Sequence, residues 1–253
     1  IVPVTGAGMR AEWILAPGAS TERVIFVVCG GAFMIGSLAL YHRVSSLLSA
    51  ASGAAVFAVD YRRAPEHPFP AALDDVRAAW DWLRVSGPPV KRIVAAGDSA
   101  GGNLMLSTLM ALRDDGQTLP AALIAMAPWT DLTLSGESIL TNAQRDPYIP
   151  ANLLPHVVDA YLQGADPASP RASPLLGSFS GMPPMMIHVG RQEVLLDDSL
   201  RLAAAARSAG VEAQVRIWDN LPHVFQLFSP FVPEARQSLD ELGQFARTRV
   251  EGS

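Results

Sequence analysis

An apolar run that ends in Gly-x-Ser-x-Gly restricts the fold of this chain more than any other feature. Residues 94–102 read Val-Ala-Ala-Gly-Asp-Ser-Ala-Gly-Gly, and a helix-like stretch follows at 103–110. The pattern predicts a strand, a sharp turn and a helix, with Ser99 on the turn. Glycines on both sides provide the space and dihedral freedom that such a turn needs. On the motif alone, a serine that only caps the helix is an equally good interpretation.

Other apolar runs along the chain also lead into segments with helical spacing. Buried strands that are apolar throughout, each followed by a helix, are typical of a mostly parallel sheet covered on both faces. We therefore predict an α/β fold of this kind. Strands are expected at 11–16, 24–28, 54–60, 92–97, 121–127, 185–190 and 213–218, and helices at 41–51, 71–85, 101–113, 195–209 and 232–250.

Length and composition favour one domain over residues 1–253. The chain has 253 residues, of which 49% are hydrophobic, and this suits a single large core. One segment, 133–184, has no clear strand and is rich in proline. It is too long for an ordinary connection, so we expect an insertion that carries function, with a helix near 152–163.

Charge and motif content exclude several classes of protein. The net charge is −5 and no basic stripe is present, so nucleic acid is not expected as a partner. No apolar run reaches the roughly 18 residues of a membrane span, and the N-terminal residues do not resemble a signal peptide, so we expect a cytoplasmic protein. The single cysteine, Cys29, allows no internal disulfide. Neither metal-ligand spacing nor a dinucleotide or phosphate loop is present, so no metal or cofactor is expected.

A serine nucleophile needs a general base and an acid that orients it. His223 lies in the loop after the last predicted strand, from which it can reach the serine turn, and we predict it as the base. His188 lies inside an apolar strand and is interpreted as a satisfied core residue. For the acid, Glu193 on the loop after residue 190 is preferred. Asp197, where a helix begins and acids are favoured by the dipole, stays an alternative.

Two glycines after the strand at 24–28 are candidates for an oxyanion site. Such a site needs backbone N–H groups directed at the oxygen on which negative charge develops. Gly30 and Gly31 can turn their amides into the cleft, and the amide of Ala100 follows the serine. A simple turn is the alternative interpretation of the two glycines.

Together these residues resemble the hormone-sensitive-lipase-like group of α/β-hydrolases, in its bacterial esterase branch (family IV). The similarity extends over 29–37, 61–71, 97–102 and 190–197 and includes His223. It implies the α/β-hydrolase fold with a cap built from 133–184. The family's oxyanion motif usually opens with histidine, and here Cys29 stands at that position without an expected catalytic role. The resemblance implies Ser99 as nucleophile, Glu193 as acid, His223 as base, and Gly30, Gly31 and Ala100 as the oxyanion hole.

The sequence thus predicts a serine carboxylesterase that hydrolyses short- to medium-chain esters through an acyl-enzyme. Two alternatives stay open. One is a non-catalytic protein that binds small molecules on the same fold, and the other is an amidase or lactonase with the same triad. The expected partner is a small ester substrate. The strand at 213–218 offers an edge through which two copies could pair as a homodimer.

Overall fold

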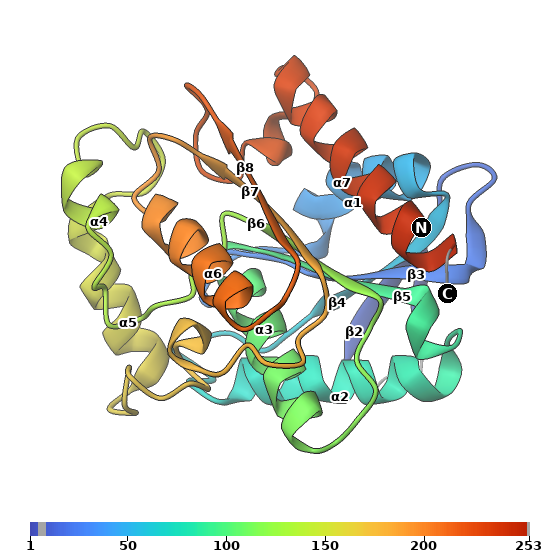
Figure 1. Ribbon diagram of the computed structural model, residues 1–253, viewed down its shortest axis with the longest axis horizontal. Helices are drawn as coiled ribbons and strands as arrows, with labels where there is room; N and C mark the ends of the chain where they lie inside the picture. Colours follow the sequence, from blue (N-terminus) through green and yellow to red (C-terminus); the bar gives the residue numbers. More distant parts are fainter. Residues whose placement is uncertain (5–8, 252–253) are drawn as a thin grey trace.

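The computed structural model describes residues 1–4 and 9–251, through which one eight-stranded sheet runs (Figure 1). All neighbouring strands from β4 to β8 are parallel, and β1 and β2 extend one edge by antiparallel pairing. This arrangement confirms the predicted mostly parallel sheet. In spatial order the strands are β1 (Val2–Val4), β2 (Arg10–Ile14), β4 (Ala54–Asp60), β3 (Ser20–Val28), β5 (Ile93–Asp98), β6 (Ala122–Met126), β7 (Met185–Gly190) and β8 (Ala213–Trp218).

Helices cover both faces of the sheet. One face carries α1 (Leu38–Ser52) and α7 (Pro233–Glu251), and the other carries α2 (Ala71–Ser86), α3 (Ser99–Asp114) and α6 (Leu196–Ser208) (Figure 1). Side chains of a strand alternate between the two faces. In β3, Phe26 packs on the α2–α3 side while Ile25 packs on the α1–α7 side. Both faces of the sheet centre are therefore buried, which is why residues 24–28 of β3 and all of β6 are apolar.

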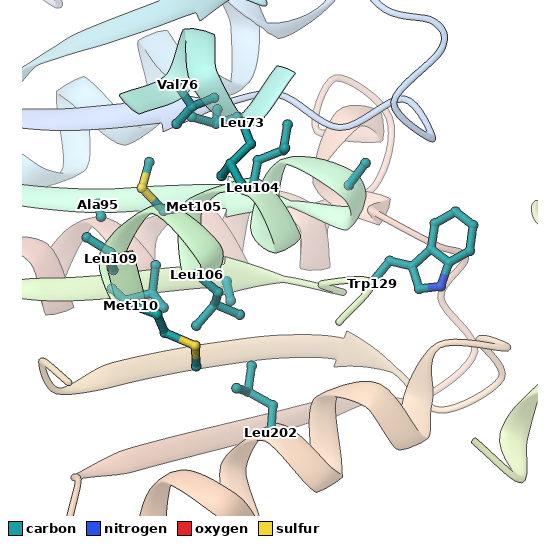
Figure 2. Close-up of a cluster of buried hydrophobic side chains, with 14 of the residues drawn as sticks. Leu73, Val76, Ala95, Leu104, Met105, Leu106, Leu109, Met110, Trp129 and Leu202 are labelled. Atoms are coloured by element: carbon teal, nitrogen blue, oxygen red, sulfur yellow. The ribbon is translucent and has the colours of Figure 1, made fainter. Parts of the chain in front are cut away.

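Helix α3 lies inside the larger core cluster. Figure 2 shows Leu104 on the side of α3 near Leu73 of α2, and Leu106 and Met110 on the side toward Leu202 of α6. Burying a side chain of this size contributes about 1.5–3 kcal/mol. Packing on two sides holds the N-terminus of α3, and thus Ser99, rigidly at the end of β5.

The connection between β6 and β7, residues 127–184, contains only short helices. They are α4 (Ser138–Thr141), η2 (Ala151–Leu153), α5 (Leu154–Leu162) and η3 (Pro174–Leu176); two more short helices, η1 (Val90–Arg92) and η4 (Phe225–Phe228), lie elsewhere. All of this connection is described, and it has no strand, as the sequence predicts. In the described part of the chain, no helix is long and apolar enough to cross a membrane.

Sequence and structure differ at several places. Strand β3 begins at Ser20 and helix α1 at Leu38, four and three residues before the predictions, and β2 ends at Ile14, two residues earlier than predicted. The short strand β1 has no counterpart among the predicted elements, because it is mostly exposed and has no buried apolar run. Helix α3 begins at Ser99, two residues before the prediction. His188 is only half satisfied: Nδ1 is 2.8 Å from Ser238 Oγ, whereas Nε2 has no hydrogen-bond partner. Burial lowers the pKa of His188 to about 3, so the ring is neutral.

Candidate active site

Ser99 occupies a strained turn between β5 and α3. Its φ is 49°, in the left-handed region that a residue with a side chain seldom adopts. A Cβ on Gly97 would lie 2.5 Å from the carbonyl oxygen of Gly101, and one on Gly101 would lie 2.1 Å from that of Val28. Only glycine fits at either position. Ser99 borders a cavity at the end of the parallel strands.

His223 and Glu193 form a buried pair beside the same cavity. Nδ1 of His223 is 2.6 Å from Oε2 of Glu193, and both side chains are almost fully buried. Glu193 follows β7, and His223 follows β8 in the loop before η4. Burial raises the pKa of Glu193, and the neighbouring His223 opposes that shift. Since Glu193 engages Nδ1, the other ring nitrogen, Nε2, is left for a proton from the nucleophile.

The two aspartates at the start of α6 have other partners. Oδ2 of Asp197 accepts the Ser138 N–H at 2.8 Å. Oδ2 of Asp198 accepts the N–H groups of Thr130 and Asp131 at 2.6 and 2.9 Å. Both carboxylates therefore anchor the connection after β6. The structure places Glu193, and not Asp197, against His223.

The loop after β3 differs from the sequence prediction at Gly30. Its N–H donates to Asp98 Oδ1 at 2.9 Å and to Tyr41 Oη at 3.1 Å, so this amide is already occupied. The next two amides, of Gly31 and Ala32, donate to no residue that the structure describes. Ala100 lies in the first turn of α3, where N–H groups have no partner within the helix. Ala32 has no role in the sequence prediction, because an alanine after two glycines gives no signal.

The cavity has a volume of about 350 Å³ and a mostly apolar lining. Ile35 and Leu40 line it beside the Gly30–Ala32 loop, and Trp129, Leu154 and Val157 line it from the connection. Its size and lining suit a small apolar ligand. Among the described residues, no group of three or more His, Cys, Asp or Glu side chains could hold a metal ion.

Side chains of the connection hold the loop that carries Glu193. Nδ2 of Asn142 donates to the carbonyls of Arg191 and Glu193 at 3.1 and 2.9 Å. The Val194 N–H donates to Asp146 Oδ2 at 2.9 Å, and the Val194 carbonyl accepts from Ser138 Oγ at 2.6 Å. These contacts could not be predicted from the sequence, because they join irregular segments about 50 residues apart.

Comparisons with known proteins agree with this fold. Residues 25–227 match a family described as alpha/beta hydrolase fold. An acetyl-hydrolase of Streptomyces hygroscopicus is 41% identical over 97% of this chain and 82% of its own length. An esterase of Acinetobacter venetianus is 37% identical over 97% and 81%. The crystal structure of an esterase from the bacterial hormone-sensitive lipase family superposes with a TM-score of 0.95 at 42% identity, covering 98% of this chain and 84% of that one.

Proposed function

Because the chain belongs to the α/β-hydrolase family, and within it to the bacterial hormone-sensitive-lipase-like esterases, it is a carboxylic ester hydrolase, and we propose that Ser99, His223 and Glu193 are its catalytic triad. One observation carries the assignment. The buried contact between His223 and Glu193 borders the same cavity as a serine held in a left-handed turn.

In the proposed reaction Ser99 Oγ attacks the ester carbonyl while Nε2 of His223 takes its proton. The Nδ1–H of His223 donates to Glu193, which holds the ring in the productive tautomer and stabilises the imidazolium. The carbon–oxygen bond to the alcohol then breaks, and the alcohol leaves with the proton from His223. Water, activated by the same histidine, hydrolyses the acyl-enzyme and frees Ser99.

The tetrahedral intermediate carries a negative oxygen that needs N–H donors. We assign these to Gly31, Ala32 and Ala100. The first two amides are without partners on a loop that lines the cavity, and the third follows the nucleophile. Gly30, whose amide is occupied, then supports the loop and does not contact the substrate oxygen.

The cavity also suggests the substrate class. An apolar space of about 350 Å³ accommodates a short- to medium-length acyl chain. Residues 133–184 contribute Leu154 and Val157 to its wall, so we propose that this segment is the cap of a single catalytic domain, 1–253. Amides or lactones would be attacked by the same triad, and a comparison of ester with amide turnover separates these activities.

The test is Ser99→Ala, assayed on p-nitrophenyl acetate and butyrate. We expect kcat to fall by about 10⁴-fold or more, because the acyl-enzyme cannot form. Ser107→Ala is the matched control, since Ser107 is a buried serine of the same helix whose hydroxyl has no hydrogen-bond partner among the described residues and which does not line the cavity. A serine-directed phosphonate should label the wild type and not the Ser99 variant. Wild-type turnover by a folded Ser99→Ala protein would refute the proposal.

A further inference from the structure

We propose that Tyr41 is a positioning residue for ester hydrolysis: together with Asp98, its hydroxyl holds the Gly30 amide and thereby aims the amides of Gly31 and Ala32 at the substrate oxygen. The inference rests on the proposed function, because it concerns the oxyanion site of the same reaction. Tyr41 belongs to α1, about 57 residues before Asp98, and nothing in the sequence links the two.

Three hydrogen bonds close a small triangle at Gly30. The Tyr41 hydroxyl donates to Asp98 Oδ2 at 2.7 Å, and the Gly30 N–H reaches both Asp98 Oδ1 at 2.9 Å and Tyr41 Oη at 3.1 Å. Asp98 is 1% exposed and Tyr41 is 5% exposed. Hydrogen bonds to a charged acceptor in such a dry environment are about twice as strong as neutral ones. The triangle therefore fixes Gly30 from two sides.

The close approach of Gly30 to Asp98 requires a residue without a side chain. A Cβ at Gly30 would lie 2.3 Å from Asp98 Oδ2 and 2.9 Å from the Asp98 carbonyl oxygen. Any side chain here would displace the carboxylate. The glycine that the sequence marks as an oxyanion donor thus lets the loop approach Asp98 closely.

The residues after Gly30 adopt a backbone that must be held in place. Gly31, Ala32 and Phe33 have φ values of 123°, 53° and 62°, three successive residues in the left-handed region. For Ala32 and Phe33 this conformation costs about 1–3 kcal/mol each. At the far end, the Phe33 carbonyl accepts the Ala64 N–H at 3.0 Å. At the near end the triangle supplies the anchor.

The side chain of the neighbouring Cys29 does not contribute to this anchor, which consists of Tyr41 and Asp98. Cys29 precedes the loop, and its carbonyl accepts the Tyr61 hydroxyl at 3.0 Å, but its thiol bonds to none of the described residues. Burial and the nearby Asp98 raise the pKa values of both Cys29 and Tyr41, so both stay protonated. The Tyr41 hydroxyl thus keeps its proton near neutral pH and can donate it to Asp98.

The test is Tyr41→Phe, which removes the hydroxyl and keeps the ring. The anchored amides matter only when negative charge develops, so kcat should fall about tenfold to a hundredfold while KM changes less than about twofold. A trifluoromethyl ketone forms a tetrahedral adduct with the serine, and its affinity should fall by the same factor as kcat/KM. Tyr161→Phe is the control, because Tyr161 is equally buried, stacks on Phe33, and its hydroxyl bonds to no described residue. It should change neither quantity.

Substitutions of Asp98 provide a second, independent measurement. Asp98→Asn keeps an oxygen for the Gly30 N–H and gains an N–H for Tyr41 Oη, so it should retain more kcat than Asp98→Ala. The losses in Tyr41→Phe and Asp98→Ala should be non-additive in the double variant, because both act through one amide.

The inference is overturned if folded Tyr41→Phe keeps wild-type kcat/KM, if its kcat falls while the ketone binds as before, or if the two losses are additive. Its failure differs from failure of the proposed function. If only the inference about Tyr41 fails, Ser99→Ala is still inactive. If the proposed function fails, Ser99→Ala retains turnover.

Discussion

The two loops that meet at the cavity are held in different ways. The oxyanion loop, residues 29–36, is strained and is anchored by one buried carboxylate and one tyrosine from the central α/β layers. The acid loop, residues 190–196, is anchored by neutral and charged side chains of the long connection, among them Asn142 and Asp146. One loop therefore depends on the sheet and its covering helix, and the other depends on the segment that also lines the cavity.

In the proposed mechanism, the two loops have different tasks that match this difference. Stabilising a developing charge requires amides that do not move, and the ends of β3 and β5, paired in register up to Val28 and Gly97, provide that rigidity. The acid loop only needs to keep Glu193 against His223. Because residues of the connection hold it, we expect changes in the connection to reach His223 through Glu193.

Of the substitutions that compare the two loops, the one at Glu193 has the largest expected effect on kcat, and it tests the acid loop directly. Glu193→Gln removes the charge that stabilises the His223 imidazolium, so kcat should fall about 10³–10⁴-fold, equivalent to ~4–5.5 kcal/mol. Asp197→Asn, the matched variant four residues further along the chain, keeps an acceptor for the Ser138 N–H and should leave kcat within about threefold. Steady-state kinetics on a chromogenic ester measure both. Equal losses in the two variants would contradict the assignment of Glu193.

The next effect concerns Asp98, the carboxylate at the end of β5 that anchors the oxyanion loop. Burial raises the pKa of Asp98 from 3.8 to about 6, against the opposing influence of Tyr41, Gly30 and His223. The folded state thus binds this proton more tightly than the unfolded state. The stability from Asp98 is fully present below about pH 4 and is lost as the pH rises through about 6, amounting to about 3 kcal/mol.

Asp98→Asn cannot titrate, so denaturant unfolding of both proteins from pH 4 to pH 7.5 isolates this contribution. Relative to the wild type, the variant should gain stability as the pH rises. Asp198, another buried carboxyl whose pKa burial raises to about 7, is present in both proteins and cancels. A constant difference in unfolding free energy across this range would mean that Asp98 does not titrate as inferred.

The smallest expected effect tests whether the connection between β6 and β7 holds the acid loop. Asn142→Ala removes the donor to the carbonyls of Arg191 and Glu193, and the acid loop should shift. We expect kcat to fall about tenfold, ~1.4 kcal/mol, with a similar loss in the free energy of unfolding. Asn152→Ala, an exposed change in the same connection, is the control and should affect neither. Wild-type kcat in folded Asn142→Ala would show that the connection does not position Glu193.

Much of the architecture follows from local patterns. The strands at 54–60 and 185–190 have the bounds that the apolar runs predict, because residues buried on both faces leave a continuous signal. The edge strand at 213–218 also has the predicted bounds, although it contains exposed residues. The turn at Ser99 is equally local, since Gly97 and Gly101 are the residues that its close approaches demand. Short β1 and the half-satisfied His188 escape prediction, because burial and partners there depend on distant segments.

By itself, the sequence determined the α/β fold, the family and the candidate residues at the ends of β5, β7 and β8, because each rests on a pattern within a few consecutive residues. Only the tertiary structure decided which groups meet. It put Glu193 rather than Asp197 against His223, and it occupied the Gly30 amide with Asp98 and Tyr41. Hydrogen bonds between residues 11 to 68 positions apart leave no periodicity or motif in the chain, so they form only when the sheet brings its strand ends together.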